Sequence, residues 1–178
     1  MARIDYYNDP RALAVHTNFS AAAAIIANSK VLCSPGVTIK EVTNQTRFRH
    51  WKSALHNHRE GEPLQRDITY KYQAAGAFHP GKHQFVGYRE HKPVAITSLL
   101  LAQGVAGIYS VITLGEARRK GIGTAMTQFA LREAQHAGYT TAILQASNAG
   151  INIYRRICFN VLYYFNYYTY LNWSQKVY

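Results

Sequence analysis

The sequence predicts an α/β fold in which helices flank a mixed, mostly antiparallel twisted sheet. Between Gln84 and Thr113, apolar stretches of strand character are separated by short turn signals, as in an antiparallel meander. From Gly121 onward, apolar residues recur every three or four positions, which is the period of an amphipathic helix. Strands and helices that succeed one another in this way pack as layers around a shared core.

The chain of 178 residues is long enough for one domain with a sizeable core. We expect residues 1–36 to form a helical N-terminal appendage and residues 37–178 to form the main domain. The segment Asn8-Asp9-Pro10 is a helix-start signal, and the Ala-rich stretch from Arg11 to Lys30 favours a helix. Ser34-Pro35-Gly36 then interrupts the chain.

The main domain is expected to open with a strand and two helices. Val37 to Val42 alternates apolar and polar residues, which predicts a strand. Asn44 is suited to cap a helix over Gln45 to Asn57. Gly61-Glu62-Pro63 breaks the chain, and a second helix is predicted over Leu64 to Ala75.

Three strands are expected next, over Gln84 to Tyr88, Pro93 to Ala102 and Val105 to Thr113. Arg89 to Lys92 and Gln103-Gly104 are the turns between them, so the three strands should form an antiparallel meander.

The second half of the domain is expected to be helix, strand, short helix and strand. Gly138 is placed to end the first helix as the glycine after its last turn. The later elements are predicted over Thr140 to Ala146, Asn148 to Arg156 and Phe159 to Leu171. The apolar face of the first helix consists of Ile122, Ala125, Met126, Phe129, Ala130, Ala134 and Ala137.

The charge balance is basic, with 20 Lys and Arg against 9 Asp and Glu and a formal net charge of +11. Such an excess favours polyanionic partners, namely nucleic acid, an anionic membrane or a phosphorylated ligand. The alternative explanation is that the protein carries a net positive charge but has no polyanionic partner.

The number of cysteines and the hydropathy of the chain indicate where in the cell the protein is expected. The two cysteines, Cys33 and Cys158, are too few for a disulfide framework and lack metal-ligand spacing, so we expect a cytoplasmic protein without a metal site. The longest apolar run, Ala21 to Ala27, is far shorter than a membrane span, and the N-terminus lacks the features of a secretory signal. No membrane partner is expected.

The segment from Arg118 to Thr124 has the features of a ligand-binding site. Its glycines let the backbone approach a ligand closely, and it opens an amphipathic helix whose first N–H groups lack helical partners. The helix dipole and the neighbouring cations suit this helix end to a pyrophosphate. The segment lacks the Gly-Lys-Ser/Thr ending of nucleotide hydrolases and the third glycine of a dinucleotide fingerprint.

Arg118-x-x-Gly121-x-Gly123 resembles the signature of the GNAT superfamily of N-acetyltransferases, Gln/Arg-x-x-Gly-x-Gly/Ala. Ile108 to Leu114 is similar to the splayed strand of that family, and Leu144 to Phe159 is similar to its later Tyr-x-x-Leu-Gly-Phe block. The resemblance implies a GNAT acyltransferase fold. It also implies an enzyme that moves an acetyl group from acetyl-CoA to an amine acceptor, by direct attack of the amine on the thioester.

The resemblance also implies the site residues. Tyr154 is the implied catalytic residue, a proton donor to the departing thiolate, and packing alone is the other explanation for this tyrosine. Backbone N–H groups near Ile112 and Thr113 are expected to polarise the acetyl carbonyl. The implied cofactor-binding residues are Val111, Ile112, Thr113, Arg118, Arg119, Lys120, Gly121, Ile122, Gly123, Thr124 and Asn148.

Three positions depart from the family pattern. The asparagine expected seven residues before the tyrosine is Ser147 here, with Asn148 next to it. Cys158 replaces the glycine before the phenylalanine, and its Cβ can constrain the backbone there. The position at which relatives that acetylate protein lysines carry a glutamate base is Gly107, so no base is visible on that strand.

The alternative function is a basic nucleic-acid-binding module, or an acyl-CoA-binding regulatory module, on the same fold. The His- and Arg-rich helix between Arg47 and Arg59 and the tyrosine run from Tyr163 to Tyr170 are consistent with nucleic acid. A solvated helix face and a strand of high β-propensity explain them more simply. Nucleic acid is therefore not the favoured partner, and if the chain self-associates we expect a homodimer.

Overall fold

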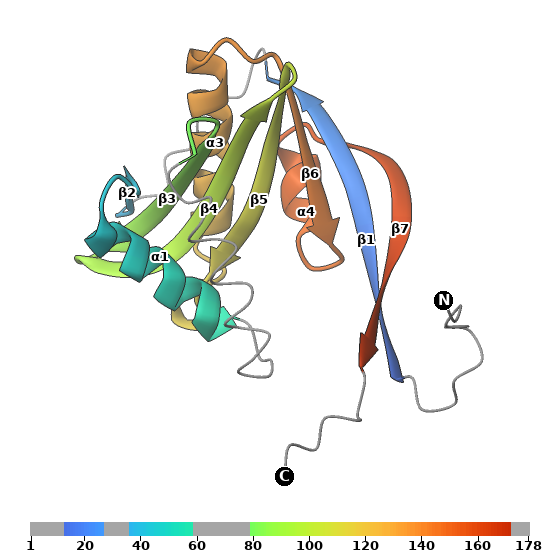
Figure 1. The fold of residues 1–178 in the computed structure, drawn as a ribbon, viewed down its shortest axis with the longest axis horizontal. Coiled ribbons are helices and arrows are strands. Elements are labelled where there is room, and N and C mark those ends of the chain that lie inside the picture. The colour runs from blue at the N-terminus through green and yellow to red at the C-terminus, as the bar shows by residue number, and fades with distance from the viewer. Residues whose placement is uncertain (1–12, 27–35, 59–78, 172–178) are drawn as a thin grey trace, which may run out of the picture.

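The computed structural model describes residues 13–26, 36–58 and 79–171 of the chain (Figure 1). Its seven strands form one open sheet in the order β2-β3-β4-β5-β6-β1-β7, and every neighbouring pair is antiparallel except β5 and β6. The strands are β1 (Leu13–Ile25), β2 (Thr38–Glu41), β3 (Lys82–Arg89), β4 (Lys92–Ala102), β5 (Val105–Thr113), β6 (Thr141–Ser147) and β7 (Asn160–Leu171). The helices are α1 (Gln45–His58), the short 3₁₀ turn η2 (Gly115–Ala117), α3 (Ile122–His136) and α4 (Ile151–Arg156).

The mixed, mostly antiparallel sheet and its flanking helices confirm the predicted fold class. The elements expected from residue 37 onward also lie where the sequence placed them, within a few residues at their ends, wherever the structure describes them. The predicted cap of α1 is present, because the backbone N–H of Arg47 donates to Oδ1 of Asn44 at 2.9 Å. The second helix predicted over Leu64 to Ala75 lies outside the described residues.

The helix expected over Arg11 to Lys30 is wrong where the structure describes that segment, because Leu13–Ile25 forms strand β1. This strand pairs with β6 on one side and with β7 on the other (Figure 1). Ala22 and Ala24 are buried among the residues packed under α3. Pairing on both edges outweighs the helix propensity of alanine, which is a weak bias. The division of the chain at residue 36 stays a prediction.

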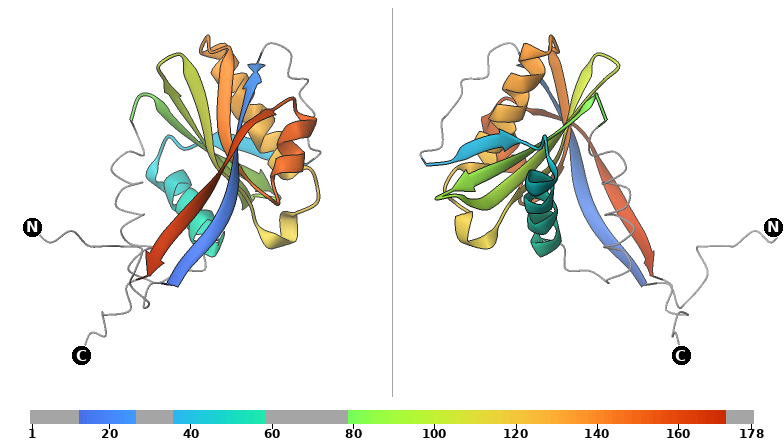
Figure 2. Two further views of the ribbon diagram at one scale, coloured as in Figure 1. Left: turned by 90° about the vertical axis from the view of Figure 1, so that its right-hand side faces the viewer. Right: turned by 60° about the vertical axis from the view of Figure 1, so that its left-hand side comes forward.

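Alternate residues of the meander strands β3, β4 and β5 face two separate clusters. In β3, Phe85 packs into the cluster under α3, and its neighbour Val86 packs into the cluster under α1, which includes Trp51. Figure 2 shows α1 on one face of the sheet and α3 on the other. The contacts of α1 lie with β3, β4 and β5. Helices α1 and α3 therefore bury their apolar sides against opposite faces of the meander.

Two tight turns fix the register of the meander. Glu90 and His91 have φ of 50° and 65° between β3 and β4, and Gln103 and Gly104 have φ of 50° and 75° between β4 and β5. Paired left-handed residues are the signature of the two-residue hairpin turn whose twist matches that of the strands. Both turns were predicted from the sequence.

The sheet opens between β5 and β6. These strands pair in parallel only from Val105 to Ile108, opposite Thr141 to Leu144. The register between β4 and β5 shifts beyond this point, and Ser110 in the shifted segment has a φ of 51°. An irregularity of this kind bends a strand. The remainder of β5 runs away from β6 in Figure 1, so its far end is not covered by a parallel neighbour.

Candidate active site

The segment between β5 and α3 is held by its own side chains. Nε of Arg118 donates to the carbonyl oxygen of Thr113 at 3.1 Å, and Nζ of Lys120 donates to that of Glu116 at 3.2 Å. Arg119 has a left-handed φ of 59°. The two hydrogen bonds hold Arg118 and Lys120 at the place where β5 ends and α3 begins.

The N-terminus of α3 has no side-chain cap. Its N-cap residue is Gly121, with φ of 75° and ψ of 0°, and the first helical bond runs from the N–H of Ala125 to the carbonyl of Gly121 at 3.0 Å. The backbone N–H groups that precede Ala125 in the helix have no partner within the helix. They carry the positive end of the helix dipole, which is the arrangement that binds phosphate groups.

Gly123 brings α3 close to the end of β5. A Cβ on Gly123 would lie 3.5 Å from Oγ1 of Thr113, and Oγ1 of Thr127 donates to the carbonyl of Gly123 at 2.9 Å. The N–H of Leu114 donates to Val94 of β4 at 2.9 Å, so the N–H of Thr113 points away from β4 by strand alternation. The uncapped N-terminus of α3 and the open side of β5 are therefore adjacent.

The side chains of Val111 and Ile112 are used for packing. Val111 lies against the cluster under α3, and Ile112 is 8% exposed in the cluster under α1. If these residues take part in binding, they do so through their backbone groups.

Tyr154 lies in α4, close to the end of β6. It is 9% exposed, and burial raises the pKa of its hydroxyl to about 12. Its ring contacts the ring of Phe159 edge-on at 6.0 Å. A Cβ on Gly150 would lie 3.0 Å from the Tyr154 ring and 3.6 Å from Oγ of Ser147, so the structure brings these three residues together.

The hydroxyl of Tyr154 makes no hydrogen bond to the described residues. A phenol that is protonated at neutral pH and keeps its donor uncommitted can give a proton to a leaving group.

The profile of the Acetyltransferase (GNAT) family matches residues 46–158, which is more than half of the chain. The chain belongs to this family. Among curated proteins, no relative matches.

Solved structures show the same fold. A GCN5-related N-acetyltransferase from Sphaerobacter thermophilus superposes with a TM-score of 0.72 at 15% identity, covering 89% of this chain and 53% of that one. One from Kribbella flavida gives 0.66 at 21% identity, covering 88% and 59%. An acetyltransferase with acetyl-CoA from Clostridium acetobutylicum gives 0.58 at 13% identity, covering 67% and 87%. The present chain thus spans less than two thirds of the length of the first two proteins.

The glycine that the GNAT pattern places after the short helix is replaced at a strained position. Cys158 is exposed and has a φ of 70°. Its N–H donates to the carbonyl of Arg155 at 3.2 Å, and the N–H of Phe159 donates to that of Tyr154 at 3.0 Å. This pair of bonds is a Schellman motif, in which glycine is preferred where Cys158 stands. Asn148 is exposed in the turn between β6 and α4.

Tyr109 was missed by the sequence analysis. The position at which some GNAT enzymes carry a base is Gly107, and a Cβ there would lie 2.9 Å from the Tyr109 hydroxyl. Tyr109 is 40% exposed and stands opposite Ser98 of β4. Alternation along β5 puts residues 107 and 109 on one face, which is a signal that the sequence did contain.

Three buried polar groups on the α1 side of the sheet also escaped notice. Gln84 and Ser98 face each other across β3 and β4, and the side-chain polar atoms of both have no hydrogen-bond partner among the described residues. Nε1 of Trp51 from α1 is in the same condition. Only the strand register pairs Gln84 with Ser98, so local sequence carried no sign of this grouping.

None of the helices in the described ranges is both long and apolar enough to cross a membrane. No group of three or more His, Cys, Asp or Glu side chains gathers as in a metal site within those ranges.

Proposed function

We propose that this protein is an N-acetyltransferase that moves an acetyl group from acetyl-CoA to an amine. The observation that carries the proposal is the uncapped N-terminus of α3 at Gly121, which lies against the open end of β5 through Gly123 and Thr113. An anion site beside an open strand suits a ligand with a pyrophosphate at one end and amide groups along its length. The acetyltransferase from Clostridium acetobutylicum, solved with acetyl-CoA, supports this choice of cofactor.

The proposed roles come from the family resemblance and are supported by the geometry of the uncapped helix end and the open strand. The N–H groups of the first turn of α3 bind the pyrophosphate, with the side chains of Arg118, Arg119 and Lys120 beside it. Backbone groups of Val111, Ile112 and Thr113 bind the pantetheine arm and the acetyl carbonyl. Asn148, in the turn between β6 and α4, remains a proposed cofactor contact.

The chemical step consumes one neutral amine. The amine nitrogen attacks the acetyl carbonyl carbon, and the carbon–sulfur bond then breaks. Tyr154 gives its proton to the thiolate, and a water takes the proton that the amine loses. A tyrosine whose pKa is raised to about 12 still holds its proton at neutral pH, which a donor must do. With Gly107 at the family's base position, we assign the first acceptor of the amine proton to water.

Two measurements test this function. Acetyl-CoA should bind saturably by calorimetry and raise the melting temperature, because a ligand that binds only the folded state stabilises it. A panel of small amines and peptides, read by release of free thiol, should then identify an acceptor. If acetyl-CoA binds tightly but no acceptor in the panel causes release of free thiol, the acyl-CoA-binding regulator is favoured over the enzyme.

The nucleic-acid-binding alternative rests on the net charge of +11. If charge alone drives such binding, it should be weak, blind to sequence and steeply weakened by salt. Tight binding to one oligonucleotide that survives added salt, without stabilisation by acetyl-CoA, would favour that alternative. A cytoplasmic location and a homodimer stay predictions.

A further inference from the structure

A pocket of about 470 Å³ lies where β2, the start of α1 and the turn between β3 and β4 meet. We call it the β2–α1 pocket. Its lining includes Lys40, Arg47, His50, Tyr88 and His91. The glycine segment before α3 is not part of this lining, and α3 covers the other face of the sheet (Figure 2). The pocket is therefore separate from the proposed acetyl-CoA site.

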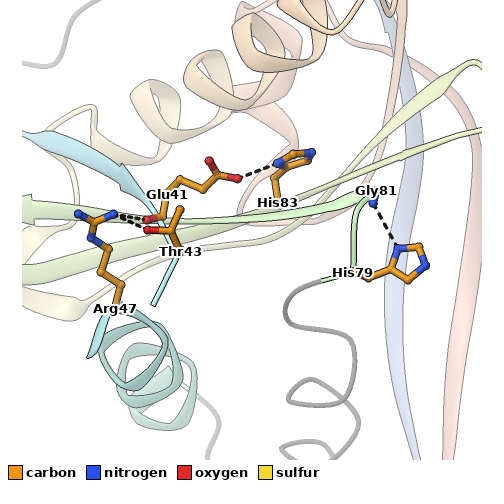
Figure 3. A network of polar contacts seen from close by, with 6 residues as sticks. All are labelled: Glu41, Thr43, Arg47, His79, Gly81 and His83. Atoms are coloured by element: carbon orange, nitrogen blue, oxygen red, sulfur yellow. Dashed lines mark hydrogen bonds and ion pairs between the residues drawn. The ribbon is translucent and has the colours of Figure 1, made fainter. Parts of the chain in front are cut away.

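Arg47 is held at the pocket by neutral oxygens. Its Nη1 donates to the carbonyl of Glu41 at 2.9 Å and to Oγ1 of Thr43 at 3.0 Å, as Figure 3 shows. Because neither partner is charged, these bonds orient the guanidinium without neutralising it. A guanidinium fixed in this way retains donors for a further acceptor.

The nearby carboxylates are directed elsewhere. Oε1 of Glu41 lies 2.7 Å from Nδ1 of His83 (Figure 3). By strand alternation, Glu41 faces away from Lys40, toward the other side of β2. Glu90 belongs to the lining, but its side chain is 84% exposed and lies 3.9 Å from Nε of Arg89. The cations of the pocket are therefore in excess over its carboxylates.

The lining of the β2–α1 pocket also includes neutral hydrogen-bond donors. The hydroxyl of Tyr88 and Nδ1 of His50 are 2.9 Å apart, and their rings meet edge-on at 5.7 Å. Thr38 stands opposite Tyr88 on β2, and Thr46 lies in the first turn of α1; both line the pocket. Hydroxyls beside an oriented guanidinium and an ammonium are a donor set that binds a compact oxyanion.

We propose that the β2–α1 pocket binds the oxyanion of a small ligand, a phosphoryl or carboxylate group, at a site independent of acetyl-CoA. Arg47 and Lys40 supply charge, and the Tyr88–His50 pair and the threonines supply hydrogen bonds. The pocket lies on the face of the sheet opposite α3, so its occupant is either a part of the acceptor distant from the transferred acetyl group or a separate effector.

The test is a titration of the full-length protein with inorganic phosphate, and in a second arm with acetate, followed through backbone amide signals in NMR. Amides of residues 44–50 should shift saturably, apart from any response of residues 121–124. In Lys40→Gln, the phosphate affinity at residues 44–50 should fall about tenfold, because one charge-assisted contact is lost. In His91→Asn the phosphate affinity should fall less than in Lys40→Gln. Asparagine is the replacement because it tolerates the left-handed φ of 65° at this turn.

Lys92→Gln is the matched control, since it removes the same charge from an exposed residue outside the lining. It should bind phosphate like the wild type. A response to phosphate but not acetate assigns a phosphoryl ligand, and equal responses assign a carboxylate as well. The proposal is overturned if chloride at equal ionic strength gives the same shifts, if only residues 121–124 respond, or if Lys40→Gln and Lys92→Gln bind alike. None of these results depends on acetyl-CoA turnover.

Discussion

Oγ1 of Thr113 lies 3.5 Å from the point at which Gly123 would carry a Cβ. This is an ordinary van der Waals distance, and Gly123 does not have a left-handed φ. The protein itself therefore tolerates a small side chain at residue 123. A ligand lying on the first turn of α3 would not, because the side chain would occupy the space through which a phosphate reaches the backbone.

Gly123→Val should weaken acetyl-CoA binding by about tenfold or more while the protein stays folded. Calorimetry gives the affinity and thermal unfolding gives the stability. Gly115→Ala serves as the control, because a Cβ on Gly115 meets nothing within 4 Å and the residue precedes the cation-rich segment. Equal affinities for the wild type and Gly123→Val would show that acetyl-CoA does not bind here.

Tyr154→Phe should lower turnover about 100-fold, with acetyl-CoA affinity nearly unchanged, if proton donation to the thiolate limits the rate. The ring and its contact with Phe159 are kept, and the lost hydroxyl makes no hydrogen bond to the described residues, so stability at pH 7 should also be unchanged. Steady-state kinetics with an identified acceptor measure the effect. An unchanged rate at equal stability would remove Tyr154 from the reaction and leave water or Ser147 as the proton source.

The raised pKa of Tyr154 also predicts a loss of stability at alkaline pH. The folded protein holds this proton up to a pKa of about 12, whereas the unfolded chain releases it near 10. The preference of the folded state for protonated over ionised Tyr154 is therefore complete below pH 10, and the stability that depends on it is lost as the pH rises from 10 to 12. It is on the order of 2 kcal/mol. Urea unfolding across this range should show a smaller loss in Tyr154→Phe than in the wild type, and parallel curves would contradict the assignment.

Cys158 and Gly138 occupy equivalent positions in two Schellman motifs, with φ of 70° and 87°. Because a Cβ is disfavoured in this conformation, Cys158→Gly should stabilise the fold by about 1 kcal/mol. Gly138→Ala, whose Cβ would meet nothing within 4 Å, should destabilise it by a similar amount through backbone strain alone. Chemical denaturation measures both. A destabilised Cys158→Gly would mean that the thiol makes a contribution larger than the strain.

Asn44→Ala should destabilise the protein by about 1 kcal/mol, because the N–H of Arg47 loses the side-chain oxygen at 2.9 Å that caps α1. Asn44→Ser, which restores a capping oxygen, should recover most of the loss. Thermal unfolding of the two variants tests this, and equal melting temperatures for both variants would argue against the cap.

The sequence by itself determined the features whose causes lie within a few neighbouring residues. The turns at Glu90-His91 and Gln103-Gly104, the cap at Asn44 and the apolar face of α3 all follow from local backbone preference and periodicity. The glycine-rich start of α3 was visible for the same reason. Together with the strand from Ile108 to Leu114 and the later block from Leu144 to Phe159, it indicated the family and the candidate cofactor site.

Only the tertiary structure decided the features that depend on partners far along the chain. Leu13–Ile25 is a strand because β6 and β7, more than a hundred residues later, pair with both of its edges. Arg47 and Tyr88 come together in the β2–α1 pocket because β2 pairs with β3 and α1 packs over the sheet. The hydrogen bonds of a full sheet outweigh the small helix preference of an Ala-rich segment, and no local pattern contains that comparison.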